Sequence, residues 1–361
     1  MTGRDGARDA ASLGHLLTWR ESSTSGEAIA VAVEAARSAP ADAIDLLRRA
    51  SRVVLTGAGS SYYLALAAAE VAREATHRPF TAAPVSEILL RPDGILVGGD
   101  PATEPVVVIS RSGSTSEAVA VADRARALGH PTIAVTCRSG SPLASRTDVT
   151  LVSPAGDEEA IVMTRSFASM LALLIGVVAS VARDERLRLD LGTAAGRWSD
   201  ASAAAAVGRR FGAIGWSRVV ILGGGAAFGI AMEWGLKLTE TSQVPTSAYE
   251  PLEFRHGPIS VCEPGVLVVG LIGGAGAAEE MRVVAEAARF GAETWVLARD
   301  DEEARDAPGT VSLIGGGLHP AARLPLLVHP AHARALTLAL TRGRDPDAPR
   351  HLGQVVIIDP P

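Results

Sequence analysis

The chain has 361 residues, of which 47% are hydrophobic and 4% aromatic, and its formal net charge is −6 at pH 7. The acidic balance argues against a nucleic-acid or anionic-membrane surface, and the length allows two domains of ordinary size. Because aromatic residues are few, the core must be aliphatic, which favours helix layers packed on a parallel sheet.

No targeting segment or cofactor motif is evident. The first residues, MTGRDGARDA, lack the apolar stretch of a signal peptide, and no apolar run reaches membrane-spanning length without glycine or charge. The two cysteines, Cys137 and Cys262, have no metal or redox spacing and are expected to be buried small hydrophobic residues. These features predict a cytoplasmic protein that acts on a small molecule, with no metal and no cofactor.

The first strand signal comes after a helical N-terminal segment that Pro40 interrupts. A strand is predicted over residues 52–55, followed by the turn TGAGSS from Thr56 and an Ala-rich helix. The turn is similar to a dinucleotide-binding glycine loop, but Tyr62 stands where the third glycine belongs and no acidic residue follows to hold a ribose. We therefore expect Ser60 and Ser61 to contribute hydroxyls rather than to bind a nicotinamide or flavin.

The stretch VVVISRSGST, residues 106–115, is the organising element of the first half. Its β-branched run predicts a strand buried on both faces of a parallel sheet, and a helix is predicted from Glu117. A helix cap would need one hydroxyl, whereas Ser110, Ser112 and Thr115 crowd this turn together with Ser114 and Ser116. Backbone N–H groups and hydroxyls at a helix N-terminus attract an anion, most plausibly phosphate.

Further strands are predicted over residues 132–136 and 149–152, then a polar turn over residues 155–159 and a long apolar helix over residues 163–182. The pattern predicts an α/β fold with doubly wound, flavodoxin-like parallel sheets and helices on both faces. We divide the chain into a helical segment (1–40), a first domain (41–195), a second domain (196–342) and a tail (343–361) that closes on the site.

The second half repeats the first. Aligning residues 55–74 with residues 221–240 pairs Gly57 with Gly223 and Gly59 with Gly225, and residues 266–271 repeat the strand before the Ser-rich turn. The hydroxyls are not repeated, because the later strand is followed by Ile-Gly-Gly-Ala-Gly. The sequence therefore predicts one phosphate per chain, held by the first domain.

The second half carries charge instead. Glu233, Lys237 and Glu240 are spaced by four and three residues, so they share one face of a predicted helix. Such spacing usually marks a solvated face with salt bridges. Here the flanking residues are apolar and Lys237 is the single lysine in a chain whose other cations are arginines, which favours a function that a guanidinium cannot serve.

A histidine follows on a turn. His256 precedes Gly257 and Pro258 after the charged run YEPLEFR, and a rigidly held histidine suits proton transfer near neutral pH. A carboxylate can remove a proton from carbon and a cation can stabilise the resulting negative charge, and Glu240 and Lys237 fit these roles.

These motifs resemble the sugar isomerase (SIS) domain family, in particular the isomerase half of glucosamine-6-phosphate synthase and the group of tagatose-6-phosphate ketose/aldose isomerases and amino-sugar-6-phosphate deaminases. The stretches that carry the resemblance are TGAGSS, ISRSGST, MTRSF, GIAMEWGLKLTE and PLEFRHGP. It extends from about residue 51 to the end of the chain.

The resemblance implies residue roles. Phosphate would be held by Ser110, Ser112 and Thr115, with Ser60 and Ser61 near the sugar and Glu158 on its hydroxyls. Glu240 would move the proton between sugar carbons. His256 would open the ring and, in a homodimer, would be donated across the interface.

Two positions depart from the family pattern. Arg111 stands where Gln is commoner, and Gln354 stands where a substrate-binding lysine is expected, so an imine mechanism would have Lys237 alone. We expect an enzyme that isomerises a sugar phosphate or releases ammonia from an amino-sugar phosphate. The alternative is a sensor that binds a sugar phosphate without converting it.

Overall fold

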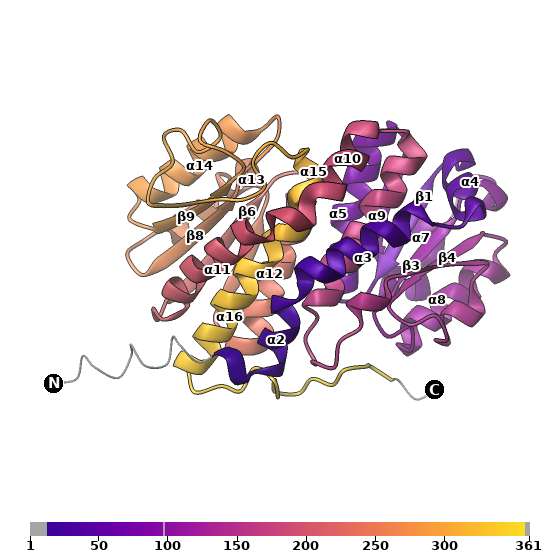
Figure 1. Ribbon diagram of the computed structural model, residues 1–361, viewed down its shortest axis with the longest axis horizontal. Helices are drawn as coiled ribbons and strands as arrows, with labels where there is room; N and C mark the ends of the chain where they lie inside the picture. Colours follow the sequence, from indigo (N-terminus) through magenta and orange to yellow (C-terminus); the bar gives the residue numbers. More distant parts are fainter. Residues whose placement is uncertain (1–12, 97, 358–361) are drawn as a thin grey trace. The chain divides into compact units, whose positions relative to one another are not determined.

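The computed structural model describes residues 13–96 and 98–357, which form two compact units (Figure 1). Each unit is built on one five-stranded parallel sheet with helices on its faces, so the predicted α/β fold is confirmed. The β1–β5 unit contains Ser25–Glu159, Arg165–Ala195 and the tail from Gly353. The β6–β10 unit contains the described residues up to Thr24, Ala160–Thr164 and Gly196–Leu352. The predicted four-segment division stays a prediction.

The sheet of the β1–β5 unit has the strand order β2-β1-β3-β4-β5. This is the order of flavodoxin-like folds, in which loops at the carboxyl ends of the strands form the ligand-binding edge. The residues of β1, β3 and β4 are all buried, as is typical of strands covered on both faces. The strands are β1 (Val53–Gly57), β2 (Phe80–Pro84), β3 (Val106–Ile109), β4 (Thr132–Thr136) and β5 (Val149–Val152).

Helices cover both faces of this sheet (Figure 1). On one face, α6 and α8 pack on the sheet through a core that includes Val54, Val108 and Val121. Elsewhere in the unit, α5 packs on α9 and α3 packs on α9. The helices are α3 (Ser25–Arg37), α4 (Ala41–Arg49), α5 (Ser60–Thr76), α6 (Val85–Leu90), α7 (Pro92–Ile95), α8 (Ser116–Ala127), α9 (Arg165–Ala182) and α10 (Glu185–Ala194). Among the described helices, α9 alone is long and apolar enough to cross a membrane, but 83% of it is buried as the central helix of this unit.

The β6–β10 unit repeats the same strand order as β7-β6-β8-β9-β10. Its strands are β6 (Arg218–Gly223), β7 (Thr246–Tyr249), β8 (Val266–Leu271), β9 (Glu293–Ala298) and β10 (Thr310–Leu313). Its helices are α2 (Leu17–Ser23), α11 (Trp198–Gly212), α12 (Ala226–Ser242), α13 (Pro251–Phe254), α14 (Ala277–Arg289), α15 (Pro320–Arg323) and α16 (His329–Thr341). The helix α14 packs on β6, β8 and β9 through Met281 and Val284, and α16 packs against α11 and α12.

The glycine pairs that the sequence aligned adopt matching conformations. Gly59 precedes α5 with φ 55° and Gly225 precedes α12 with φ 53°. Residues that carry a side chain rarely adopt this backbone conformation. A Cβ on Gly57 would lie 2.6 Å from the backbone of Ser61, and a Cβ on Gly223 would lie 2.5 Å from the backbone of Ala227. Each helix therefore starts close against the strand that precedes it, which directs its N-terminus to the carboxyl edge of the sheet.

The sequence predicted β1, β3, β4, β5 and β8, and its internal repeat aligned the end of β6 with the end of β1. It did not predict β2, β7, β9 and β10, although β9 is buried after Glu293. β2 and β7 are partly exposed, and β10 is an edge strand, so the continuous apolar run that marks a central strand is absent there. The charged stretch 183–202 contains α10 and the start of α11. Cys137 and Cys262 are free and buried as expected, and burial raises the pKa of both thiols.

Close packing of α11 on α16 gives a test of the β6–β10 unit. A Cβ on Gly212 would lie 2.6 Å from the backbone oxygen of Arg334, and neither helix backbone can yield without disturbing the core. We expect Gly212→Ala to lower the free energy of unfolding by about 1–3 kcal/mol, measured by denaturant unfolding. Gly235→Ala, within α12 but 3.6 Å from its nearest neighbour, is the control. We expect that control to be neutral or stabilising by up to about 1 kcal/mol, and equal losses in the two variants would contradict the packing argument.

Candidate functional site

The loop between β3 and α8 presents hydroxyls at the carboxyl edge of the β1–β5 sheet. The N–H of Gly113 donates to Ser110 Oγ at 3.2 Å, and the N–H of Ser114 donates to Ser112 Oγ at 3.1 Å. Each hydroxyl thus accepts a bond from its own loop, which orients it and keeps its proton for another acceptor. Thr115 occupies the N-cap position of α8 but its side chain makes no capping hydrogen bond. The hydroxyls of this loop therefore do more than cap the helix, and they suit an anion.

The neighbouring loop adds two more hydroxyls. Ser60 and Ser61 lie in the first turn of α5, directly after β1, and both are buried. Since β1 pairs in parallel with β3, the loops that follow the two strands open at the same edge of the sheet. The N-termini of α5 and α8 each contribute a partial positive charge there. All five serine and threonine residues predicted to bind substrate thus lie in this unit.

Glu158 lies beneath the Ser-rich loop. Its buried carboxylate accepts hydrogen bonds from the N–H of Arg165 at 2.9 Å and from the hydroxyl of Ser166, and it lies 3.5 Å from Arg111 Nη1. Arg111 is itself buried, so the two form an ion pair inside the unit. These contacts support a role for Glu158 in holding Arg111, and the direct contact with sugar hydroxyls stays a prediction.

The tail contacts the same loop through the two residues that depart from the family pattern. Arg111 Nη2 donates to the backbone oxygen of Gln354 at 2.9 Å, and Gln354 Nε2 donates to the backbone oxygens of Glu158 at 2.9 Å and Glu159 at 3.3 Å. The N–H of Ser116 donates to the backbone oxygen of Val356 at 3.3 Å. Arg111 and Gln354 thus act as one pair that fixes the tail across the N-terminus of α8.

Helix α12 of the β6–β10 unit holds the predicted acid, base and cation. Lys237 Nζ lies 2.5 Å from Glu240 Oε2 and 3.4 Å from Glu233 Oε1. The exposed fractions are 2% for the side chain of Lys237, 0% for Glu233 and 18% for Glu240. The three residues share one face as the spacing predicted, but this face is buried rather than solvated. Glu240 is the most exposed member of the cluster.

The two carboxylates decide the protonation state of Lys237. Burial lowers the pKa of the amine, but the charges of Glu233 and Glu240 and their hydrogen bonds outweigh burial, and the net pKa is raised. Lys237 is therefore an ammonium at neutral pH. An ammonium stabilises developing negative charge but cannot attack a carbonyl.

His256 belongs to a different part of the same unit, after α13. It follows α13 on an exposed turn in which Gly257 has φ 123°, a conformation that favours glycine. Over the described residues, no hydrogen bond or ion pair joins His256 to Lys237 or Glu240. In the same ranges no three His, Cys, Asp or Glu side chains gather as metal ligands do.

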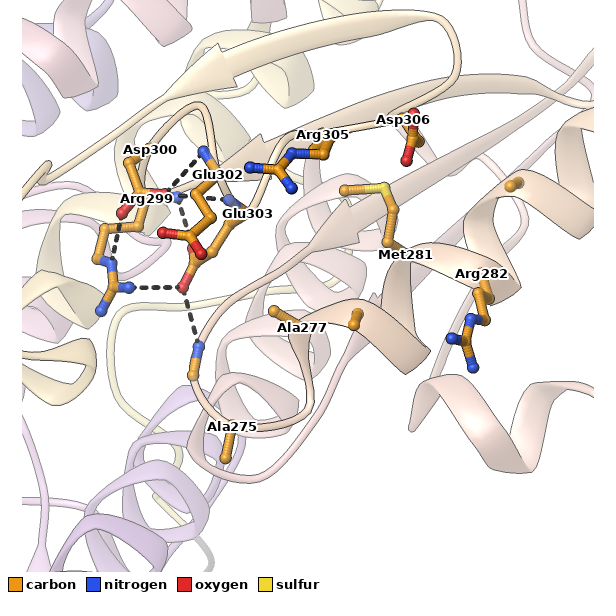
Figure 2. A pocket seen from close by; sticks show the side chains of 13 residues that line it. Ala275, Ala277, Met281, Arg282, Arg299, Asp300, Glu302, Glu303, Arg305 and Asp306 are labelled. Carbon is orange, nitrogen blue, oxygen red and sulfur yellow. Dashed lines mark hydrogen bonds and ion pairs between the residues drawn. The ribbon is translucent and has the colours of Figure 1, made fainter.

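In the β6–β10 unit, carboxylates occupy the loop that corresponds to the Ser-rich turn. Glu303 Oε1 accepts from the N–H of Gly274 at 3.2 Å and Glu303 Oε2 accepts from the N–H of Arg299 at 2.9 Å. Glu303 is also ion-paired with Arg299, as Figure 2 shows. Both residues line a hollow of about 570 Å³, together with Met281 and Arg305. Because internal anions already satisfy these N–H groups, the loop is unsuited to phosphate, which supports the expectation of one phosphate per chain.

A second carboxylate, Glu280, reaches the same loop. Its Oε2 accepts from the N–H of Gly273 at 3.5 Å, and a Cβ on Gly224 would lie 2.1 Å from its Oε1. Burial raises the pKa of Glu280 to about 7; the Gly273 hydrogen bond opposes this rise and the negative charge of Glu303 adds to it. Buried Arg323 lies 3.8 Å from Glu303 and donates to the backbone oxygens of Ile272 and Leu297.

Sequence reasoning missed a set of buried polar residues on α2 and α16. Ser22 of α2 hydrogen-bonds both His329 and His332 of α16, and Glu21 accepts from the N–H of Ala160 at 2.9 Å. These partners are 139 to 310 positions apart in the chain, so no spacing rule connects them. A signal exists in retrospect, since the buried face of α2 carries polar residues where apolar ones are the rule.

The Arg111 contacts predict how the tail is held. In Arg111→Leu the tail loses a charge-assisted hydrogen bond and Glu158 loses its buried partner, so we expect backbone amides in residues 353–357 to exchange at least about tenfold faster. Hydrogen exchange with mass spectrometry measures this. Arg138→Gln, which breaks an exposed pair with Asp157, should leave the tail unchanged. Unaltered tail protection in Arg111→Leu would contradict the assignment.

The raised pKa of Glu280 predicts a pH dependence of stability. Between its ordinary value of 4.5 and about 7, the folded state binds a proton that the unfolded state has lost, so stability falls as pH rises through this window. Glu280→Gln should therefore raise the free energy of unfolding by up to about 3 kcal/mol at pH 8 and by much less at pH 5. Denaturant unfolding at the two pH values measures the difference. Glu279→Gln, at an exposed neighbour, is the control, and an equal gain at both pH values would exclude this linkage.

Curated proteins match this sequence over most of its length. The chain is 27% identical over 334 residues to the isomerizing glutamine–fructose-6-phosphate aminotransferase of Bacillus subtilis, covering 89% of this chain and 54% of that protein. The corresponding enzyme of Pyrobaculum aerophilum is 30% identical over 331 residues, covering 87% and 52%. The chain thus spans about half the length of the curated relatives it matches.

Solved structures agree with the fold. The glucosamine-6-phosphate deaminase of Thermotoga maritima superposes with a TM-score of 0.74 and 25% identity, covering 94% of this chain and 99% of that one. The tagatose-6-phosphate ketose/aldose isomerase of Escherichia coli gives a TM-score of 0.81 at 24% identity, covering 95% and 96%. The SIS domain family matches residues 46–179 and 214–305. Since these ranges make up more than half of the chain, this protein belongs to the SIS domain family.

Proposed function

We propose that this protein is an enzyme that acts on a sugar phosphate, either as an aldose–ketose isomerase or as an amino-sugar-6-phosphate deaminase that also isomerises. The observation that carries the proposal is the buried cluster on α12, in which an ammonium sits between two carboxylates and Glu240 alone remains partly exposed. Exposed ion pairs contribute little to stability and are common on protein surfaces. This cluster is buried instead, which favours a functional role over a surface salt bridge.

In the proposed reaction, Glu240 removes a proton from the sugar carbon next to the carbonyl and returns it to the adjacent carbon. Lys237 holds the Glu240 carboxylate in place at 2.5 Å and supplies positive charge toward the enediol or enolamine. The raised pKa of Lys237 favours this electrostatic role over imine formation. Proton transfer by Glu240 is therefore common to both candidate reactions.

The Ser-rich loop of the β1–β5 unit is the proposed phosphate site. Ser110, Ser112 and Thr115 would donate hydroxyl hydrogen bonds, with Ser60 and Ser61 nearby and the tail, through Arg111 and Gln354, closing over the loop. Charge-assisted hydrogen bonds of about 1.5–3 kcal/mol each would anchor the end of the sugar remote from the reacting carbons.

His256 is the proposed ring-opening group. Its exposure on a turn held by Gly257 and Pro258 supports donation to a second copy of the chain in a homodimer, as the family resemblance implies. Binding without turnover, the sensor alternative, is an outcome of the experiment below.

The test is to incubate the purified protein in D₂O with ketose, aldose and amino-sugar 6-phosphates. We expect turnover of at least one, with deuterium incorporated at a sugar carbon because the base exchanges its proton with solvent. Glu240→Gln should lower kcat by about 10²–10⁴-fold, the usual contribution of a general base. Ser112→Ala should raise KM by about tenfold or more through loss of a hydroxyl from the phosphate site.

Matched controls separate these effects from general damage. Glu279→Gln and Ser145→Ala change exposed residues of the same types and should leave both constants unchanged. Ammonia release distinguishes the deaminase from the isomerase. Saturable binding that is weakened by Ser112→Ala but accompanied by no turnover would support the sensor, and neither binding nor turnover on any substrate would overturn the proposal.

A further inference from the structure

The tail reaches the N-terminus of α8 with a residue that the proposed function does not use. The N–H of Ser116, the first residue of this helix, donates to the backbone oxygen of Val356 at 3.3 Å. The first N–H groups of a helix have no acceptor within the helix and need one from elsewhere. In this structure a carbonyl group of the tail therefore serves as the acceptor for a donor at the end of α8.

This helix end adjoins the proposed phosphate site. Thr115, one of the residues proposed to bind phosphate, is the N-cap of α8, and its side chain makes no capping hydrogen bond. N–H groups at a helix N-terminus bind phosphate oxygens, and the helix dipole favours the negative charge. A phosphate at Thr115 and the carbonyl of Val356 would therefore draw on the same group of N–H donors.

The tail is held more firmly at Gln354 than at Val356. The backbone oxygen of Gln354 accepts a charge-assisted hydrogen bond from Arg111 Nη2 at 2.9 Å, and its side chain donates at 2.9 Å to the backbone oxygen of Glu158. The Val356 bond joins two neutral groups and, at 3.3 Å, is longer than the usual range for N–H···O. Exposed fractions of 56% for Val356 and 72% for Ile357 mean that side-chain burial contributes little at this end.

Phosphate is the stronger of the two acceptors. Its oxygens carry charge, and hydrogen bonds to a charged acceptor are roughly twice as strong as those between neutral groups. The backbone of Ser116 has one N–H proton, so full bonds to Val356 and to a phosphate oxygen exclude each other. Phosphate binding at this helix end therefore favours loss of the Val356 contact, whereas Gln354 bonds to other groups and keeps its contacts.

We propose that residues 355–357 form a strap that phosphate displaces: the Val356 carbonyl and a phosphate oxygen are alternative acceptors for the Ser116 N–H. When phosphate binds, the strap leaves α8 while Gln354 stays on Arg111. This inference rests on the proposed function, because it uses the same phosphate site.

The first test uses the unchanged protein with inorganic phosphate as the probe. ¹H–¹⁵N spectra follow phosphate binding at the amide of Ser116, and the heteronuclear NOE reports how rigidly each tail amide is held. We expect a saturable shift of the Ser116 signal and a fall of about half or more in the NOE of Val356 and Ile357, with Gln354 unchanged. Sodium chloride at equal ionic strength is the control. An unchanged or higher NOE at Val356 with phosphate bound would overturn the strap.

A backbone substitution tests the carbonyl itself. The α-hydroxy analogue of isoleucine at position 357 turns the amide between Val356 and Ile357 into an ester, whose carbonyl is a weaker hydrogen-bond acceptor. We expect phosphate to bind at least about threefold more tightly, because its competitor is weakened. The α-hydroxy analogue of leucine at position 352 makes the same change before these contacts. This control should leave the dissociation constant of phosphate within about twofold of its value for the unchanged protein.

Failure of the strap and failure of the phosphate site give different results. If the unchanged protein binds no phosphate, the proposed site and the strap are both refuted. If phosphate binds, is weakened by Ser112→Ala, and binds equally well to the ester at position 357, the strap alone is refuted. None of these measurements needs turnover, so they do not depend on which sugar phosphate is the substrate.

Discussion

Parallel pairing of strands is the constraint on which the described features depend. In both sheets each strand is followed by a loop and a helix whose N-terminus opens at the same edge, so backbone N–H groups gather there. Glycines with positive φ before α5 and α12 allow the helices to start close to their strands. The first N–H groups of each helix have no acceptor within the helix, so they need acceptors from elsewhere. The two units supply these acceptors in different ways.

In the β1–β5 unit the loop at this edge carries hydroxyls, which we propose bind phosphate, and in the β6–β10 unit the corresponding loop is bonded by the protein's own carboxylates. Ser110 and Ser112 receive backbone hydrogen bonds and keep their own protons. Glu303 takes the corresponding N–H of Gly274 and is itself held by Arg299. The two units share one strand order, so the proposed difference in anion binding would come from the exchange of hydroxyls for a carboxylate at this edge. The same unit could then devote α12 to a different chemistry.

The sequence was most informative where the physics is local. The β-branched run at Val106, the glycine pairs and the i, i+3, i+4 spacing of Glu233, Lys237 and Glu240 each depend on neighbours within one turn or strand, and the structure shows each of them. The unusual status of a single lysine pointed to α12 without any structure.

Long-range contacts were beyond sequence reasoning. Arg111 and Gln354 were each noted as departures from the family pattern, but their contact joins residues 243 positions apart. The Ser22–His332 bond spans 310 positions, and the histidine gives no local sign of its buried setting. The partly exposed strands β2 and β7 escaped notice because half-covered strands lack a continuous apolar run. What could not be predicted is which polar residues meet when helices pack.

The burial of Lys237 has a consequence for the chemistry of the folded surface. Since the chain has one lysine and its side chain is 2% exposed, the folded protein offers no accessible lysine amine to acylating reagents. Acetylation, ubiquitination and amine-directed crosslinking at lysine would each require local opening of the β6–β10 unit, so acylation of Lys237 would report that opening.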